Sequence, residues 1–475
     1  MEDGHRSPRR GRARRGPEHR EEHRGDFRQA LPGETQVLRE TPRTAHAAAR
    51  PRRRGPRRRH HRRRLGLDLP PAPRAPGTGA VVHPRARPVA AGPGARADLA
   101  VAMRVLYANH SCVLRINQER LHVLARNRGI EVGLLVPSRW HDRDTAHRYD
   151  FEPPHVADFA VFVRDALLTW HPALFAYRWR AVARVLDAYR PDVVHVEQEP
   201  YSIVAWQIAK AARARGMKIV LSTYQNLDKR YPLPFRLIER SVLGSVSGLV
   251  AGTPEIQRLW QRRAGRSDVR VIPLGYDPER FQPRADPALR ARLGLRAFVI
   301  GYLGRLIPAK GLRTLLEAAA RLPGDFSLLI DGRGPDRREL EQVADRLGVA
   351  SKLVFMDPSH EEVPAYLACM DALVLPSYTT PEWAEQFGRV LVEAMACGVP
   401  VVGSASGAIP FVIGDAGLVF PERDSAALTK CLERLLTEPE LRQELRRRGL
   451  ERARTYFSWE RVANLMVEVY REVLG

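Results

Sequence analysis

The chain has 475 residues, of which 28% are charged, and its formal net charge at pH 7 is +23. This length suffices for two or three domains whose cores are large enough to need no disulfides. The four cysteines form no C-x-x-C pair and have no His-rich spacing, so we expect reduced core thiols, no metal site and a cytoplasmic protein. No run of about 18 apolar residues occurs, which excludes a predicted membrane-spanning helix and leaves peripheral contact with the inner face of the cell membrane open.

Most of the positive charge lies in residues 1–102, which hold 25 Arg, no Lys and 10 acidic residues, a balance of +15. This segment is rich in Arg, Pro, Gly and Ala and lacks sustained apolar periodicity, so it cannot bury enough surface to offset chain entropy and is predicted to be disordered. A basic arm for nucleic acid or anionic lipid would fit the charge, but aromatic residues that could stack on bases are nearly absent.

The segment has two other interpretations. A targeting peptide fits poorly, because there is no apolar core region and the segment contains acids. We favour the view that Met103 is the true start and that the upstream residues are read-through of GC-rich sequence, since the whole chain has 71 Arg and only 6 Lys. No nucleic-acid partner is therefore expected.

From Met103 onward, short β-branched runs alternate with helical patterns, which is typical of parallel sheets covered by helices. In the first half, strands are predicted at 103–108, 131–136, 191–196, 217–222, 248–252 and 269–275. The proline-rich segment 276–296 breaks this rhythm and is predicted to be a linker with a short helix.

A second alternation follows, with strands predicted at 298–304, 326–332, 352–356, 372–377, 399–404 and 417–420. The sequence thus predicts an α/β protein with two parallel-sheet domains, at 103–280 and 281–456. The amphipathic stretch 457–475 is predicted to be a helix that packs back across the domain junction.

The motif GYLGRLIPAKG, residues 301–311, brings two cations to the end of a strand. Ligands of parallel sheets bind outside the carboxyl ends of the strands, where helix amides face the crevice. Arg305 and Lys310 would suit a diphosphate there, although this motif alone slightly favours two solvated surface cations. The following motif DGRGPDRREL, 331–340, has the glycines that any strand-to-helix turn needs.

The stretch EQFGRVLVE, 385–393, leads into a predicted helix that is apolar on most sides. Glu393 lies among apolar residues, where an ionised carboxylate costs several kcal/mol unless it is hydrogen-bonded, and sugar hydroxyls would supply the donors. Glu385, in the loop before the helix, can face the same crevice, and the amides of Phe387, Gly388 and Arg389 suit a phosphate or sugar. The alternative, a solvated helix face, predicts polar neighbours around Glu393.

The motifs GRLIPAKG, IDGRGP and PSYTTPEWAEQFGRVLVEAMACGVPVVGS resemble the successive donor-site motifs of family 4 retaining glycosyltransferases. The upstream VIPLGYDPERFQP resembles that family's linker entry. The resemblance implies the GT-B fold, in which two Rossmann-like domains face each other across a cleft, with the acceptor on the N-terminal domain and a nucleotide-sugar donor on the C-terminal one.

The resemblance also implies roles for individual residues. Arg305 and Lys310 would neutralise the diphosphate, Glu393 would bind the ribose, and Glu385 would meet the transferred sugar. Phe387 and Gly388 match the loop whose amides touch the donor, and residues 357–359, beginning with Asp357, would line the base pocket. The nucleotide-diphosphate sugar is then a substrate, with no cofactor and no metal, because two cations can stabilise the leaving group.

The first domain departs from the family pattern. A Gly-Gly loop is replaced by NHSCVLRINQE, 109–119, and a His-Glu-Pro by Gln198-Glu199-Pro200. Glu199 is a candidate catalytic residue with an acceptor or transition-state role, whereas His195 is expected to be a packed core residue. The acceptor-side candidates are Asn109, His110, Tyr224 and Asn226, with Lys229 in the same loop.

We therefore expect a retaining hexosyltransferase that acts on a glycan or lipid-linked acceptor, in cell-surface polysaccharide or glycoconjugate biosynthesis. Its expected catalytic residues are Glu385, Arg305, Lys310 and Glu199. The alternatives are a GT-B relative such as a nucleotide-sugar epimerase, or a nucleic-acid-binding protein acting through the basic segment.

Overall fold

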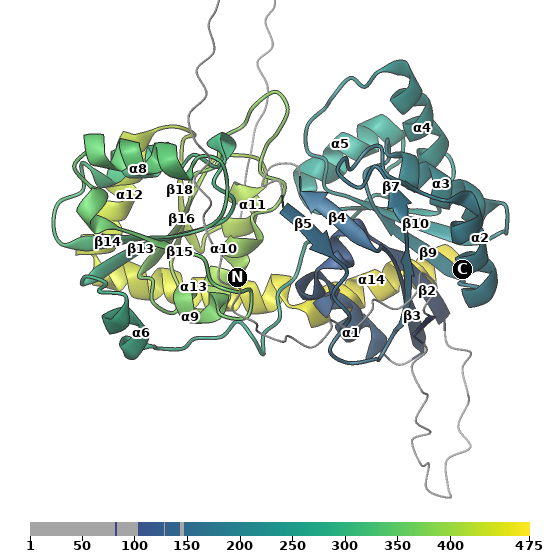
Figure 1. The fold of residues 1–475 in the computed structure, drawn as a ribbon, viewed down its shortest axis with the longest axis horizontal. Helices are drawn as coiled ribbons and strands as arrows, with labels where there is room; N and C mark the ends of the chain where they lie inside the picture. The colour runs from purple at the N-terminus through teal and green to yellow at the C-terminus, as the bar shows by residue number, and fades with distance from the viewer. Residues whose placement is uncertain (1–80, 83–102, 128, 143–146) are drawn as a thin grey trace, which may run out of the picture. The chain divides into compact units, whose positions relative to one another are not determined.

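The structure is a computed structural model, and it describes residues 81–82, 103–127, 129–142 and 147–475 (Figure 1). The predicted disorder of residues 1–102 lies outside the described residues, apart from β1 (Val81–Val82), which pairs antiparallel with β6 (Ala160–Arg164). Within the described residues, no helix is long and apolar enough to cross a membrane.

The first sheet has eight strands in the order β1-β6-β3-β2-β9-β10-β11-β12, and all of its pairings except that of β1 are parallel. Its central strands are almost fully buried because helices cover both faces, as their continuous apolar runs require. The remaining strands are β2 (Met103–Ala108), β3 (Ile130–Pro137), β9 (Val193–Glu197), β10 (Lys218–Thr223), β11 (Gly248–Ala251) and β12 (Arg270–Val271).

The helices of the first domain divide between the two faces of this sheet. One hydrophobic cluster joins it to α2 (Trp179–Tyr189), α3 (Ile203–Arg213), α4 (Leu233–Leu243) and α5 (Pro254–Ala264). Another joins the opposite face to the 3-10 turn η1 (His110–Val113), to α1 (Glu119–Ala125) and to α14 (Trp459–Leu474). A second 3-10 turn, η2 (Arg115–Gln118), lies between η1 and α1 in the chain.

The second sheet has six parallel strands in the order β15-β14-β13-β16-β17-β18. They are β13 (Phe298–Leu303), β14 (Phe326–Asp331), β15 (Leu353–Met356), β16 (Ala372–Leu375), β17 (Val401–Ser404) and β18 (Gly417–Phe420). The helical elements are α6 (Pro287–Arg292), η3 (Pro308–Lys310), α7 (Leu312–Ala319), α8 (Arg337–Arg346), η4 (Ala350–Lys352), α9 (Val363–Leu367), α10 (Arg389–Ala396), α11 (Ile409–Ile413), α12 (Ser425–Thr437) and α13 (Pro439–Phe457).

Each sheet has one place where the strand order reverses. In the first sheet the chain runs outward through β2, β3 and β6 and then continues on the other side of β2 with β9. In the second sheet it runs outward through β13, β14 and β15 and then continues on the other side of β13 with β16. Such switch points leave a crevice at the carboxyl ends of the two adjacent strands, which is where ligands bind in open parallel sheets.

The chain returns from the second sheet to the first at its C-terminal end, drawn in yellow in Figure 1. Helix α13 packs against α10, and α14 packs against α1 and β10. The buried Trp459 and Tyr470 anchor α14 to the first sheet. A backbone pair between Tyr276 and Ser458 ties the linker to the start of this helix.

The twelve predicted strands correspond to observed strands, with ends that differ by a few residues. The sequence prediction missed β6 and two short hairpins, β4 (Arg139–Asp142) with β5 (His147–Asp150) and β7 (Ala166–Leu167) with β8 (Ala176–Tyr177). The hairpins expose much of their length, so they lack the apolar runs that identified the buried strands.

Candidate active site

At the switch point of the second sheet, a buried ion pair joins two of the predicted residues. Lys310 ends η3, and its Nζ lies 2.6 Å from Oε2 of Glu385. The same oxygen accepts a hydrogen bond from Ser377 Oγ at 2.9 Å, and both charged side chains are about one-tenth exposed. Because a buried charge is costly without its partner, the ion pair and the Ser377 hydrogen bond together hold Glu385 in one position.

The backbone of Glu385 is fixed as well. Its carbonyl accepts hydrogen bonds from Asn226 Nδ2 at 2.8 Å and from the amide of Ala408 at 2.9 Å. A Cβ at the neighbouring Gly407 would lie 2.1 Å from this carbonyl, so only glycine allows so close an approach. The loop that carries Glu385 is therefore held by both domains.

Helix α10 begins directly after this loop. Gly388 precedes it with a φ of +79°, a conformation that favours glycine, and no side chain caps the helix start. The amides of the first turn are then available to an anionic ligand.

Glu393 has a protein partner that the sequence analysis did not foresee. Its Oε1 lies 3.0 Å from Nε of Arg389, one turn earlier on α10, and Arg389 Nη1 donates to Asn117 Oδ1 of the first domain at 3.0 Å. The carboxylate is buried, as expected, but its neighbours are not all apolar, because a long arginine side chain at position i−4 reaches over it.

At the switch point of the first sheet, Glu197 is the centre of a buried polar network. It ends β9 and forms an ion pair with Arg120 Nη1 at 2.7 Å, with both side chains little exposed. It also accepts hydrogen bonds from Asn109 Nδ2 at 2.7 Å and from the Tyr107 hydroxyl. The Arg120 guanidinium in turn lies over the rings of Tyr107 and Trp459.

Glu199 lies two residues beyond this network and is held by the end of β10. Its carboxylate accepts hydrogen bonds from Thr223 Oγ1 and from the amide of Tyr224 at 3.3 Å. Burial raises the pKa of Glu199 to about 7, although these hydrogen bonds act in the opposite direction. The group is therefore able to gain or lose a proton near neutral pH.

Two histidines near this edge are neutral at physiological pH. A hydrogen bond of 3.1 Å joins His110 Nδ1 to Gln198 Oε1, and burial lowers the pKa of His110 to about 4. His195 is fully buried between Tyr470 and Ser222, and burial lowers its pKa to about 3. His195 is thus a packed core residue, as predicted.

A cavity of about 780 Å³ is lined by both switch points. The first domain contributes Asn109, His110, Glu199 and Tyr224, and the second contributes Arg305, Glu385, Phe387, Gly388 and Arg389. Lys310 and Glu393 do not line it themselves, but each is ion-paired to a side chain that does. Asn226 does not line it either, because its amide is bonded to the Glu385 carbonyl; Lys229 similarly donates to the carbonyl of Glu382.

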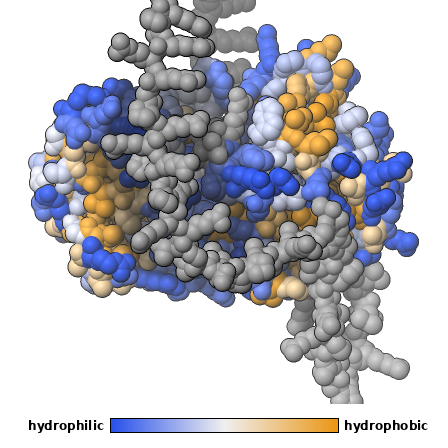
Figure 2. Space-filling model, viewed as in Figure 1, coloured by the Kyte–Doolittle hydropathy of each residue, from blue (hydrophilic) through white to orange (hydrophobic). Residues whose placement is uncertain are grey.

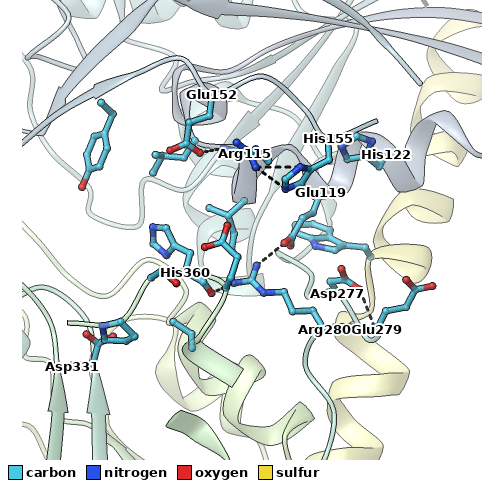
Figure 3. A pocket seen from close by; sticks show the side chains of 18 of the residues that line it. Arg115, Glu119, His122, Glu152, His155, Asp277, Glu279, Arg280, Asp331 and His360 are labelled. Carbon is cyan, nitrogen blue, oxygen red and sulfur yellow. Dashed lines mark hydrogen bonds and ion pairs between the residues drawn. The ribbon is translucent and has the colours of Figure 1, made fainter. Parts of the chain in front are cut away.

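A second cavity, of about 800 Å³, extends from Arg305 along the ends of β14 and β15 (Figure 3). Its second-domain wall includes Asp331, Arg333 and Asp357, and Arg333 makes two hydrogen bonds to Asp357, of 2.7 and 2.8 Å. Burial raises the pKa of Asp331 to about 7. Across the cavity, Arg280 forms an ion pair of 2.7 Å with Glu119.

Sequence reasoning missed Arg120, Asn117 and the Arg280–Glu119 pair. No sequence signal singled out Arg120, because the stretch ERLHVLA also contains Glu119 and His122. Within the part of the chain that the structure describes, no group of three or more His, Cys, Asp or Glu residues is placed to hold a metal ion. The expectation that no metal takes part stays a prediction.

Comparisons with known proteins find family matches in both domains. The family model "Glycosyltransferase Family 4" matches residues 119–280, and "Glycosyl transferases group 1" matches residues 288–452. The chain is 36% identical over 332 residues to D-inositol 3-phosphate glycosyltransferase of Geodermatophilus obscurus, which covers 63% of this chain and 71% of that protein. It is 34% identical over 260 residues to the enzyme of the same name from Saccharomonospora viridis, covering 50% and 58%.

Two solved structures are similar in fold. Sucrose-phosphate synthase from Thermosynechococcus elongatus gives a TM-score of 0.61 at 22% identity and covers 78% of this chain and 99% of its own. Anabaena Alr3699/HepE in complex with UDP and glucose gives a TM-score of 0.61 at 19% identity, covering 78% and 100%. The two Rossmann-like parallel sheets of this chain therefore have the arrangement of GT-B proteins.

Proposed function

The chain is a glycosyltransferase of family 4 with the GT-B fold, and on this premise we propose that it transfers a hexose-type sugar, with retention and without a metal, from a nucleotide-diphosphate sugar to a hydroxyl acceptor. The observation that carries the proposal is the cavity whose wall joins Arg305, Glu385 and the start of α10 to Glu199 of the other domain. A similar protein, Anabaena HepE, was solved with UDP-glucose, which supports a nucleotide sugar as donor.

The donor diphosphate would lie at the second-sheet switch point. Arg305 offers a planar guanidinium for its oxygens, and the free amides at the start of α10 add partial positive charge. As the bond between the anomeric carbon and the diphosphate oxygen breaks, negative charge grows on the leaving group, and these groups together with Lys310 would stabilise it.

The buried pair of Lys310 and Glu385 suggests how the sugar would be oriented. Both Lys310 and Ser377 bond to Oε2 of Glu385, so Oε1 is the oxygen that we expect to accept a hydrogen bond from a sugar hydroxyl. The ribose would lie beside Glu393, so its hydroxyls and Arg389 would both bind the Glu393 carboxylate. The base would lie beside residues 357–359, which follow β15.

The acceptor would lie on the first-domain wall, beside Asn109, His110 and Tyr224. A new bond forms between the acceptor oxygen and the anomeric carbon, and the acceptor hydroxyl loses its proton. Glu199, with its pKa near 7, is our candidate for binding that hydroxyl and accepting the proton. The relatives are named for D-inositol 3-phosphate, which makes a cyclitol phosphate the first acceptor to test and glycan or lipid-linked acceptors the second.

A panel assay tests this proposal. The full chain is incubated with UDP-, GDP- and ADP-sugars and with either D-inositol 3-phosphate or lipid-linked acceptors, and the product's anomeric configuration is read by NMR. We expect a glycoside with the donor's configuration. Epimerisation of the sugar without transfer, or no turnover of any nucleotide sugar, would contradict the proposal.

A further inference from the structure

Exposed apolar side chains gather in one part of the first domain. Of the ten large hydrophobic side chains that are exposed among the described residues, seven belong to residues 156–237. Six of these, which we call the apolar rim, lie on the β7–β8 hairpin, at the start of α2 and on α4: Leu167, Leu168, Trp170, Trp179, Leu233 and Leu237.

Helix α4 presents leucines where a helix on the outside of a domain normally presents polar residues. Leu233 and Leu237 are 64% and 59% exposed and lie one turn apart, with the exposed Arg236 and Arg240 beside them. Figure 2 shows the resulting hydrophobic patch over the helix that Figure 1 labels α4. Exposed leucines beside arginines are typical of a helix that lies in a membrane interface.

The other members of the rim come from neighbouring elements. Helix α3 packs against β8, α2 and α4, so the hairpin, the start of α2 and α4 border one helix. Trp179 is 46% exposed and packs edge-to-face against Trp206 of α3, with ring centroids 5.6 Å apart. Trp170 is 45% exposed and is one of the residues that line the 780 Å³ cavity. Tryptophan suits such a place, because its ring is apolar and its N–H is polar.

The charge around the rim is positive. The acidic residues of α2 and α4 already form ion pairs, Asp187 with Arg215 at 2.7 Å and Glu239 with Arg263 at 2.8 Å. Within the described residues, no ion pair engages the exposed arginines of this region, which are Arg178, Arg180, Arg184, Arg230, Arg236 and Arg240. A surface that combines exposed leucine and tryptophan with uncompensated arginine is complementary to anionic lipid headgroups above an apolar layer.

We propose that the apolar rim is the docking surface for an anionic membrane. Leu233, Leu237 and the two tryptophans enter the boundary between headgroups and acyl chains, and the arginines contact the lipid phosphates. Helices of a parallel sheet begin at the carboxyl ends of its strands, so docking brings the membrane to the edge where the cavity opens. If the proposed transfer reaction is correct, the acceptor hydroxyl can then be presented by a lipid.

Vesicle binding of the full chain, without donor or acceptor, tests docking separately from transfer. The vesicles contain equal parts of phosphatidylglycerol and phosphatidylcholine, with bromine on the acyl chains so that tryptophans near the apolar layer lose fluorescence. The basic segment 1–102 contains no tryptophan, so binding through that segment alone gives no quenching. Binding is also measured at about 1 M NaCl, where the Debye length is about 3 Å and purely ionic binding is screened.

We expect tryptophan quenching that persists at high salt, and a fall of about tenfold or more in vesicle affinity for the variant L233S/L237S, because two leucine side chains no longer leave water. Val419→Ser, an exposed residue of the second sheet, is the matched control and should bind like the parent. W170F/W179F should bind but lose most of the quenching. Equal binding by L233S/L237S and the parent, or binding with no quenching, would overturn the proposal.

Discussion

The two switch points of this molecule are built in different ways. At the second sheet, the charged groups come from short, continuous motifs, and their ion-pair partners lie in the same domain, as for Lys310 with Glu385 and Arg389 with Glu393. At the first sheet, the centre is a buried network around Glu197, with members from β2, α1 and β9 that are up to 90 residues apart.

The two sites therefore differ in how far apart their residues lie in the sequence. The residues of the donor side lie in short sequence motifs, because a helix start and the preceding loop supply most of the contacts to the donor. The acceptor side depends on burial, which brings distant residues together and makes their charges costly to separate. Mutations should therefore affect chemistry most on the second sheet and stability most on the first.

The largest expected effect on activity comes from Lys310→Ala. It removes a cation from the proposed diphosphate site and leaves the buried Glu385 carboxylate without its partner. Transfer should fall by about 10²–10³-fold, which is the usual effect of removing one group that stabilises transition-state charge. Steady-state transfer rates measure this, and Lys218→Ala, at an exposed position of β10, is the control. A rate within twofold of the parent would show that the second switch point is not the donor site.

Arg120→Met should have the largest effect on stability. It leaves the buried Glu197 carboxylate unpaired, so the free energy of unfolding should fall by about 3 kcal/mol, as for other broken buried pairs. Urea unfolding measures the loss. The double variant R120M/E197Q, which removes both charges, should recover much of it. If R120M unfolded like the parent, the network would not be a stability element and the contrast between the two edges would be wrong.

Glu199→Gln should change stability in a pH-dependent way. Burial raises the pKa of Glu199 from 4.5 to about 7, so its contribution to stability is fully present below pH 4.5 and is lost as pH rises through 7. The glutamine variant cannot ionise, and at pH 8 it should be more stable than the parent by about 1–3 kcal/mol, while the two should be alike near pH 4. Unfolding curves at the two pH values test this. Transfer should fall in the variant at all pH values, and full turnover would remove Glu199 from the site.

The smallest expected effect is that of Asn226→Ala, which removes one hydrogen bond between the two domains. Its amide holds the carbonyl of Glu385, so kcat/KM should fall by about fivefold, equivalent to roughly 1 kcal/mol, with little change in unfolding. Asn127→Ala, which loses a hydrogen bond inside the first domain, is the matched control. An equal loss in both variants would mean that the bond has no special role in placing Glu385.

The sequence was sufficient for much of the second domain. Strands such as β13 are continuous apolar runs, and their predicted and observed ends differ by one residue, 298–304 against Phe298–Leu303. Gly388 directly precedes α10, where its φ of +79° favours glycine. Glu393 was correctly expected to be buried, but Arg389 as its partner was not foreseen, since an i, i+4 pair depends on side-chain direction as well as spacing.

The first domain was harder to predict for physical reasons. Its hairpins are short and partly exposed, so they carry no period-2 pattern long enough to recognise. Asn226 was expected on the acceptor side, but it is bonded to the Glu385 carbonyl, a contact between loops 159 residues apart that only the tertiary structure creates. Arg120 was missed because its partner, Glu197, is 77 residues away.

The central claim is that a donor diphosphate is held at the switch point of the second sheet, and nucleoside diphosphate binding by the full chain tests it most directly. Calorimetric titration with UDP and GDP gives a Kd for the parent and for Arg305→Ala. Because a guanidinium can make two charge-assisted hydrogen bonds to phosphate, the variant should bind the preferred nucleotide about tenfold or more weakly. Equal affinity of the parent and Arg305→Ala would contradict the account.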